Sequence, residues 1–154
     1  MEKGNYGKFL LMLLVSFIVM YAIMYANVAS EEHIYFSLNR FYMTILMVVP
    51  MGFIMLLFMQ RMYKNRKKNN VIIITGVLLF TAAFVMLRTQ TYINDVRYME
   101  AMIPHHSSAI LSSQHAGLKD PEVQELSKKI IESQQKEIEQ MKAMIQRLKN
   151  STEE

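Results

Sequence analysis

The stretch FYMTILMVVPMGFIMLLFM, residues 41–59, contains 19 residues and no charge. Two further uncharged runs, residues 9–29 and 71–87, lie on either side of it along the chain. A helix needs about 20 predominantly apolar residues to cross the hydrocarbon core of a bilayer, with about 17 as the lower end. The sequence therefore predicts three transmembrane helices. The first run is longer than the ~7–15-residue core of a cleaved signal peptide, so we interpret it as an uncleaved anchor.

Lysine and arginine are unevenly distributed around these runs. The loop SEEHIYFSLNR, residues 30–40, carries Arg40 alone, beside Glu31 and Glu32. The N-terminal segment and the loop of residues 60–70 together carry seven basic residues: Lys3, Lys8, Arg61, Lys64, Arg66, Lys67 and Lys68. Because short basic loops stay in the cytoplasm, we expect a multi-pass protein of the cell membrane with everything after residue 87 outside. The net charge of +4 then comes mainly from the basic residues that orient the membrane helices. We therefore expect the lipid bilayer as a partner and no nucleic acid.

A polar tail follows the third apolar run. We therefore expect a membrane domain, residues 1–88, and an extracytoplasmic domain, residues 89–154. The tail is interrupted at GLKDPE, where Gly117 suits a helix C-terminus, Asp120 is a good N-cap and Pro121 suits the first helical position. The sequence predicts an all-α chain that ends in an antiparallel hairpin of two helices.

Each helix of the hairpin has an apolar seam. The upstream seam consists of Tyr92, Val96, Met99, Ile103, His106, Ile110 and Ser113. The downstream seam, on a helix from Pro121 to about Leu148, consists of Val123, Ile130, Ile138, Met141, Ile145 and Leu148. A lone hairpin buries too little surface to be stable by itself. We expect a second copy to complete a four-helix bundle, with packing on the membrane helices as the alternative.

The segment YMEAMIPHHSSAI, residues 98–110, gathers sulfur and imidazole. At about 100° per residue, Met99, Met102 and His106 share one helix face, and His105 flanks it. With a turn near residues 118–119, His106 would be level with Ile131. The same register puts Glu137 level with Glu100. One flank of the second helix would then carry Gln134, Glu137, Met141 and Met144.

These residue types suit a soft metal ion. Thioether and imidazole groups together favour Cu(I), with silver as a chemical mimic. We expect Met99, Met102, His105 and His106 as primary ligands, Met141 and Met144 as secondary ligands, and Gln134 and Glu137 as groups that orient imidazole. The alternative is ordinary packing, since methionine is a flexible core filler and Glu137 can simply bind a seam histidine.

The same residues carry a family resemblance. The patterns M-x-x-M-I-x-H-H-x-x-A-I and Q-x-x-E-I-x-x-M resemble the family called domain of unknown function 305 (DUF305). They fall on Met99, Met102, His105, His106 and Ala109, then on Gln134, Glu137, Ile138 and Met141. The resemblance covers residues 92–148. It implies an exported ferritin-like helical bundle associated with copper or silver binding and tolerance. Family members commonly have two such hairpins, whereas this chain has one and adds three membrane spans.

Other functions are open at this point. A ferritin-like oxidase needs Glu-x-x-His pairs. Three residues after Glu100 stands Ile103, and three residues after Glu137 stands Gln140. We therefore expect no enzyme. Copper transport through the spans is a second alternative, suggested by Met43, Met47, Met51, Met55 and Met59, although a four-residue step spirals around a helix. The third is a structural hairpin without metal. We favour a membrane-anchored copper-binding protein for tolerance, buffering or handover to a metallochaperone.

Overall fold

The computed structural model describes residues 5–151, and all of its regular elements in that range are helices. The chain divides into two compact units. Residues 5–24 with Asn39–Tyr92 form unit 1, and Tyr25–Leu38 with residues 93–151 form unit 2. The segment of residues 25–38, which we expected in the membrane domain, thus packs with the C-terminal residues.

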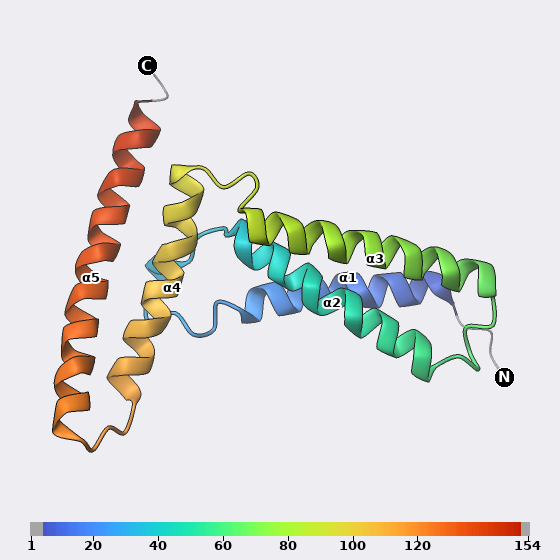
Figure 1. Ribbon diagram of the computed structural model, residues 1–154, viewed down its shortest axis with the longest axis horizontal. Coiled ribbons are helices and arrows are strands. Elements are labelled where there is room, and N and C mark those ends of the chain that lie inside the picture. Colours follow the sequence, from blue (N-terminus) through green and yellow to red (C-terminus); the bar gives the residue numbers. More distant parts are fainter. Residues whose placement is uncertain (1–4, 152–154) are drawn as a thin grey trace. The chain divides into compact units, whose positions relative to one another are not determined.

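Unit 1 contains three long apolar helices: α1 (Tyr6–Ile23), α2 (Leu38–Phe58) and α3 (Arg66–Thr89) (Figure 1). All three are long and apolar enough to cross a membrane. The side chains of α1 and α3 are mostly exposed, with Phe9 the one buried residue of α1, whereas those of α2 are mostly buried or partly buried. A helix that is apolar all round is typical of a lipid environment. These properties confirm three candidate spans in the order that the sequence predicts.

The first span is shorter than expected. We predicted it over residues 9–29, but α1 ends at Ile23. The following residues belong to unit 2, where the Tyr25 hydroxyl donates to the Tyr35 carbonyl at 2.7 Å and the Ala29 N–H donates to Ser107 Oγ at 2.7 Å. These bonds hold residues 25–29 in a non-helical conformation. The helix therefore ends before the apolar run does.

Two glycines allow close helix packing in unit 1. A Cβ atom on Gly76 of α3 would lie 2.6 Å from the ring of Phe53 on α2, and one on Gly52 of α2 would lie 3.2 Å from Leu13 on α1. Small residues at such contacts let membrane helices approach each other.

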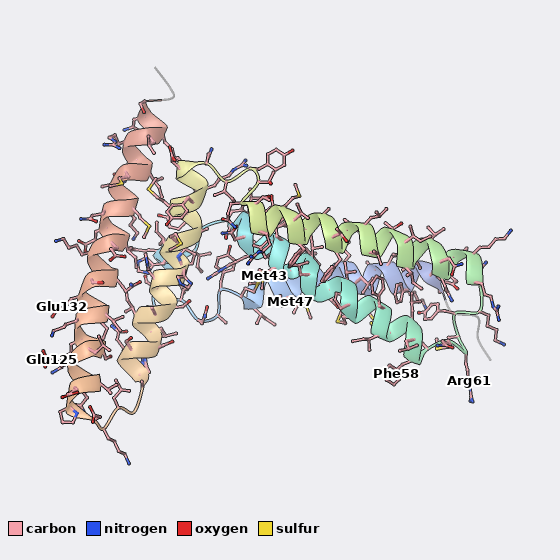
Figure 2. All side chains as sticks on the ribbon, viewed as in Figure 1. Met43, Met47, Phe58, Arg61, Glu125 and Glu132 are labelled. Atoms are coloured by element: carbon pink, nitrogen blue, oxygen red, sulfur yellow. The ribbon has the colours of Figure 1, made fainter. Side chains whose placement is uncertain are left out.

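The methionines of α2 do not share one environment. Met43 and Met47, labelled in Figure 2, are each 39% exposed, whereas Met55 and Met59 pack against the cluster of Phe9 and its neighbours. The row therefore passes from the surface of the unit into its packed interior, as a four-residue step on a helix requires.

Unit 2 is built on α4 (Asp95–His115) and α5 (Pro121–Asn150), which run antiparallel side by side (Figure 1), with the short 3-10 helix η1 (Glu31–His33) against α4. Asn94 caps α4 through Arg97 N, and Asp120 caps α5 through Glu122 N and Val123 N. A single cluster forms the core of the helix pair: Met99, Ile103, Ile110, Ile138 and Ile145.

Several details of the predicted seams are wrong. Tyr92 precedes α4 with a φ of 63° and is 69% exposed, and Val123 is 45% exposed. Gly117 has no positive φ, because the chain leaves α4 in an extended conformation at Ala116. A left-handed glycine is therefore not what ends this helix.

The helix register also differs from the expected one. Glu137, expected level with Glu100, instead lies with its Oε2 atom 3.3 Å from Nε2 of His106. Glu100 pairs with Lys149 at 2.9 Å. The Ser127 hydroxyl donates to the Ser113 carbonyl at 3.2 Å. Each contact reaches further toward the C-terminus of α5 than the predicted register, by three positions at Ser113 and by six at His106, although the connection of residues 116–120 is centred on the predicted turn.

Candidate metal site

The candidate ligands lie on one continuous helix. Pro104 is inside α4 and buried, and the helix continues through it to His115. The hydroxyl of Ser108 donates to the Pro104 carbonyl at 2.9 Å, so that oxygen has a partner. Pro104 therefore lies in the interior of α4 and does not start a new helix.

His106 is the best-defined candidate. Its side chain is 14% exposed, and its Nε2 atom faces Glu137. Burial lowers the pKa of His106 more than the Glu137 carboxylate raises it, with His105 adding a smaller lowering. The lowered pKa favours the neutral ring, and the tautomer with its proton on Nε2 suits the nearby carboxylate.

The other nitrogen of that ring is unpaired. His106 Nδ1 is buried and has no hydrogen-bond partner in residues 5–151. Gln134 Oε1 on α5 is in the same condition. A buried acceptor without a partner costs free energy, and a histidine whose second nitrogen donates to a carboxylate is the usual arrangement of a metal ligand. The environment of His106 therefore fits a ligand better than a hydrogen-bonded core histidine.

The methionines divide into buried and exposed ones. Met99 is 7% exposed within the core cluster of unit 2, and Met141 packs against that cluster from α5. Met102 is partly buried, whereas Met144 is 46% exposed. The structure thus brings Met99 and Met141 into one cluster and leaves Met144 at the surface.

His105 is separated from this interior. Its side chain is exposed, and its ring centroid lies 6.1 Å from that of His106. Gln134 and Glu137 are partly buried on α5, and of the two Glu137 makes a direct contact with His106. His105 and Met144 are therefore peripheral to the pair His106–Glu137.

The described residues hold no group of three His, Cys, Asp or Glu side chains that could share a metal ion. His106 and Glu137 alone are too few for a site of hard or borderline ligands. Met99 and Met141 lie in the core cluster of the same helix pair, and thioether sulfur is a ligand type that favours soft ions such as Cu(I).

The comparison with known families concerns the same helices. Residues 87–154 match the family described as Domain of unknown function (DUF305). The chain belongs to the DUF305 family. The match contains every candidate ligand named above and confirms the resemblance found in the sequence.

A relative extends the comparison to the membrane part. An uncharacterized protein of Acanthamoeba polyphaga mimivirus is 35% identical over 146 residues, which cover 92% of this chain and 93% of that protein. Similarity therefore extends well beyond the DUF305 domain into the three apolar helices. No solved structure matches the chain.

The segment of residues 25–38 adds contacts to the DUF305 domain that we did not predict. Ser107 Oγ, one residue beyond His106, accepts the Ala29 N–H and lies 2.9 Å from His33 Nδ1. His33 is 6% exposed, and its neighbour Glu32 lies 3.4 Å from Lys142 Nζ on α5. The only signal for this contact in the sequence is weak, a histidine in a short loop. Nothing in the sequence connects His33 with Ser107, which lie 74 positions apart.

The two buried histidines predict a pH dependence of the metal-free protein. Burial is the main cause that lowers the pKa of His33, with Lys142 adding to it and Glu32 opposing it. His106 shifts in the same direction. Below the ordinary pKa of about 6.5, the unfolded chain then binds protons that the folded chain does not, so stability falls as pH falls.

We expect the unfolding midpoint of unit 2, followed by amide hydrogen exchange, to decrease between pH 7 and pH 5. The double variant His33→Asn with His106→Asn should flatten this dependence, whereas the exposed His115→Asn should preserve it. A dependence that persists in the double variant would assign the effect to other groups.

Proposed function

We propose that the DUF305 domain binds a soft metal ion, with Cu(I) preferred and Ag(I) as its chemical mimic. The observation that carries the proposal is His106, whose Nε2 atom faces a carboxylate and whose buried Nδ1 atom has no hydrogen-bond partner among residues 5–151. A neutral imidazole in this state has one lone pair available for a ligand.

The ligand set follows from the surroundings of His106. Met99 and Met102 on α4 supply thioethers, and Met141 supplies one from α5. Glu137 orients the imidazole, and Gln134 provides a further buried acceptor nearby in the sequence of α5. Sulfur with imidazole suits Cu(I) and does not suit Mg²⁺ or Ca²⁺.

The exposed candidates complete the set at its edge. His105 and Met144 lie at the surface of the helix pair. We assign them a secondary role, in which they pass the ion between solvent and the interior. The proposed ligands contain no thiol, so they cannot be lost to disulfide formation.

The biological role is tolerance, buffering or handover of the metal, without catalysis. In this proposal the three apolar helices anchor the domain, and the basic residues of the 60–70 loop place that loop in the cytoplasm and the DUF305 domain outside. A metallochaperone is the partner that handover requires. Cu(I) transport through α2 is less favoured, because its methionines are divided between surface and interior.

We also propose that two copies complete a ferritin-like four-helix bundle. Val123 and Leu126 on α5 are 45% and 57% exposed. They line a cleft of about 230 Å³ with Leu118 and Ile130. Covering this surface would bury apolar area that a single helix pair leaves in water. Mass photometry of the full chain in micelles should show a dimer, and a monomer at all concentrations would contradict this part of the proposal.

Titration of the full chain with Cu(I) tests the metal proposal. The protein in micelles should withdraw Cu(I) from a competing chelator with a saturable endpoint, should bind Ag(I) at the same site, and should not bind Mg²⁺. Absence of saturable Cu(I) binding would leave the structural role. The full chain is needed because residues 25–38 pack in the same unit as α4 and α5.

A further inference from the structure

One end of unit 1 has a cleft with two chemically different walls. The cleft, about 880 Å³ in volume, lies between the end of α2, the connection that follows it and the start of α3. Ile54, Leu57 and Ile73 form an apolar wall, and Ile54 and Leu57 are more than half exposed. Lys64 and Arg66 line the same cleft. A site of this kind suits a molecule with an apolar body and an anionic group.

The described residues of unit 1 contain no acidic partner for the cations at this end. Residues 5–24 and 39–92 contain eight Lys and Arg residues and no Asp or Glu. Six of the eight lie at the end with the cleft: Lys8, Arg61, Lys64, Arg66, Lys67 and Lys68. Within residues 5–151, neither Lys64 nor Arg66 forms an ion pair. No acidic side chain in the described part of unit 1 balances these two cations, and an anionic ligand would do so.

The start of α3 increases this need. Its first turn carries Arg66, Lys67 and Lys68 and no acidic residue. Cations at a helix N-terminus oppose the positive end of the helix dipole, whereas an anion there is stabilising. A second cleft, about 290 Å³ in volume, repeats the pattern, with Lys67 and Lys68 beside Leu10 and Val71. The three cations of the first turn of α3 thus line two neighbouring clefts that also have apolar walls.

Hydrogen bonds hold the connection that carries Lys64. The Tyr6 hydroxyl donates to Asn69 Oδ1 at 2.8 Å and accepts the Asn65 N–H at 3.2 Å. Asn69 Nδ2 donates to the Tyr63 carbonyl at 2.8 Å, and Asn65 Oδ1 caps α3 at Lys68 N. These bonds join α1, the connection and α3. The cations are therefore presented on a fixed backbone.

We propose that this cleft binds an anionic glycerophospholipid, with Lys64 and Arg66 holding the headgroup phosphate and the acyl chains lying along Ile54, Leu57 and Ile73. A free phosphate would leave the apolar wall in water, and a zwitterionic lipid would leave the cations unbalanced. The location agrees, because α2 and α3 are candidate spans and the cleft lies where they end and begin. In Figure 2, Phe58 and Arg61 project from the same end of the unit.

Native mass spectrometry of the full chain tests the proposal. The protein is released from micelles that contain phosphatidylglycerol or phosphatidylcholine with identical acyl chains. It should retain phosphatidylglycerol preferentially. The double variant Lys64→Gln with Arg66→Gln should lose about tenfold or more of that retention. Its matched control, Lys8→Gln with Arg61→Gln, removes the same charge outside the cleft and should change retention by less than about twofold.

Further arms separate the alternatives. The charge-conserving variant Lys64→Arg with Arg66→Lys should retain the lipid, which keeps the test decisive if the glutamine variant fails to fold. Excess glycerol 3-phosphate should not displace the lipid. Equal loss in the matched control would indicate a general surface charge, displacement by the soluble phosphate would indicate a free-anion site, and equal retention of both lipids would exclude headgroup recognition. Each of these three results would overturn the proposal.

Discussion

The double variant Met102→Leu with His106→Ala is expected to lose more than about 100-fold of the Cu(I) affinity of the full chain. Loss of an outer hydrogen-bond partner alone costs metal sites roughly 10–100-fold, and this variant removes two proposed ligands. His106 is singled out by its buried, unpaired Nδ1 atom, and leucine replaces the partly buried Met102 with little change in volume. Competition titration with a Cu(I) chelator measures the effect.

A matched variant controls for the loss of sulfur and imidazole in general. Met43→Leu with His115→Ala removes one thioether from α2 and one exposed imidazole from α4. We expect its affinity to remain close to that of the unsubstituted chain, with unchanged helix content. If this control weakened binding as much as the test variant does, the site would not be the one beside His106, and α2 would become the better candidate.

Ile138→Ala is expected to destabilise unit 2 by about 2–5 kcal/mol, the usual cost of deleting a buried isoleucine side chain to alanine. Ile138 on α5 is 0% exposed and lies in the same cluster as Ile103, which is also 0% exposed. Hydrogen exchange of peptides from α4 and α5, measured on the full chain, separates this loss from the behaviour of the membrane helices.

The exposed Gln135 provides the comparison for that experiment. It lies on the same helix and outside the cleft proposed for the dimer, so Gln135→Ala should change stability by no more than about 0.5 kcal/mol. Faster exchange in α4 and α5 for Ile138→Ala alone is the expected pattern. Similar protection in both variants would show that the cluster around Ile138 is not the core of unit 2.

The sequence was sufficient for features that depend on neighbouring residues. Three uncharged runs predicted the spans, and Asp120 followed by Pro121 predicted the start of α5. Uniform hydrophobicity and helix caps are local properties, so a single chain reveals them. The ends of the elements were less predictable, since the bonds of Tyr25 and Ala29 that stop the first helix at Ile23 involve residues elsewhere in the chain.

Contacts between distant residues were the main omission. The bond between Ser107 and Ala29 and the approach of His33 to Ser107 depend on how the chain after α1 folds onto α4. No periodicity connects these positions. The register of α4 against α5 was also displaced, because the composition of the two seams does not specify how far one helix is shifted along the other.

The candidate site was predictable in its chemistry and less so in its geometry. Residue types alone suggested that Glu137 could bind His106, and the structure contains that contact. The spacing did not predict that His105 and Met144 are exposed. It gives the angle of each side chain around its own helix, but not which part of that helix the neighbouring helix covers. The role of these residues as metal ligands stays a prediction.

X-ray absorption spectroscopy at the copper edge tests the central claim most directly. For the full chain loaded with Cu(I), we predict a first shell with both sulfur and nitrogen neighbours. The variant Met99→Leu with Met102→Leu should lose sulfur from that shell and keep the imidazole. A shell of nitrogen and oxygen alone, or a sulfur contribution unchanged in that variant, would contradict a site made by the thioethers of α4 together with His106.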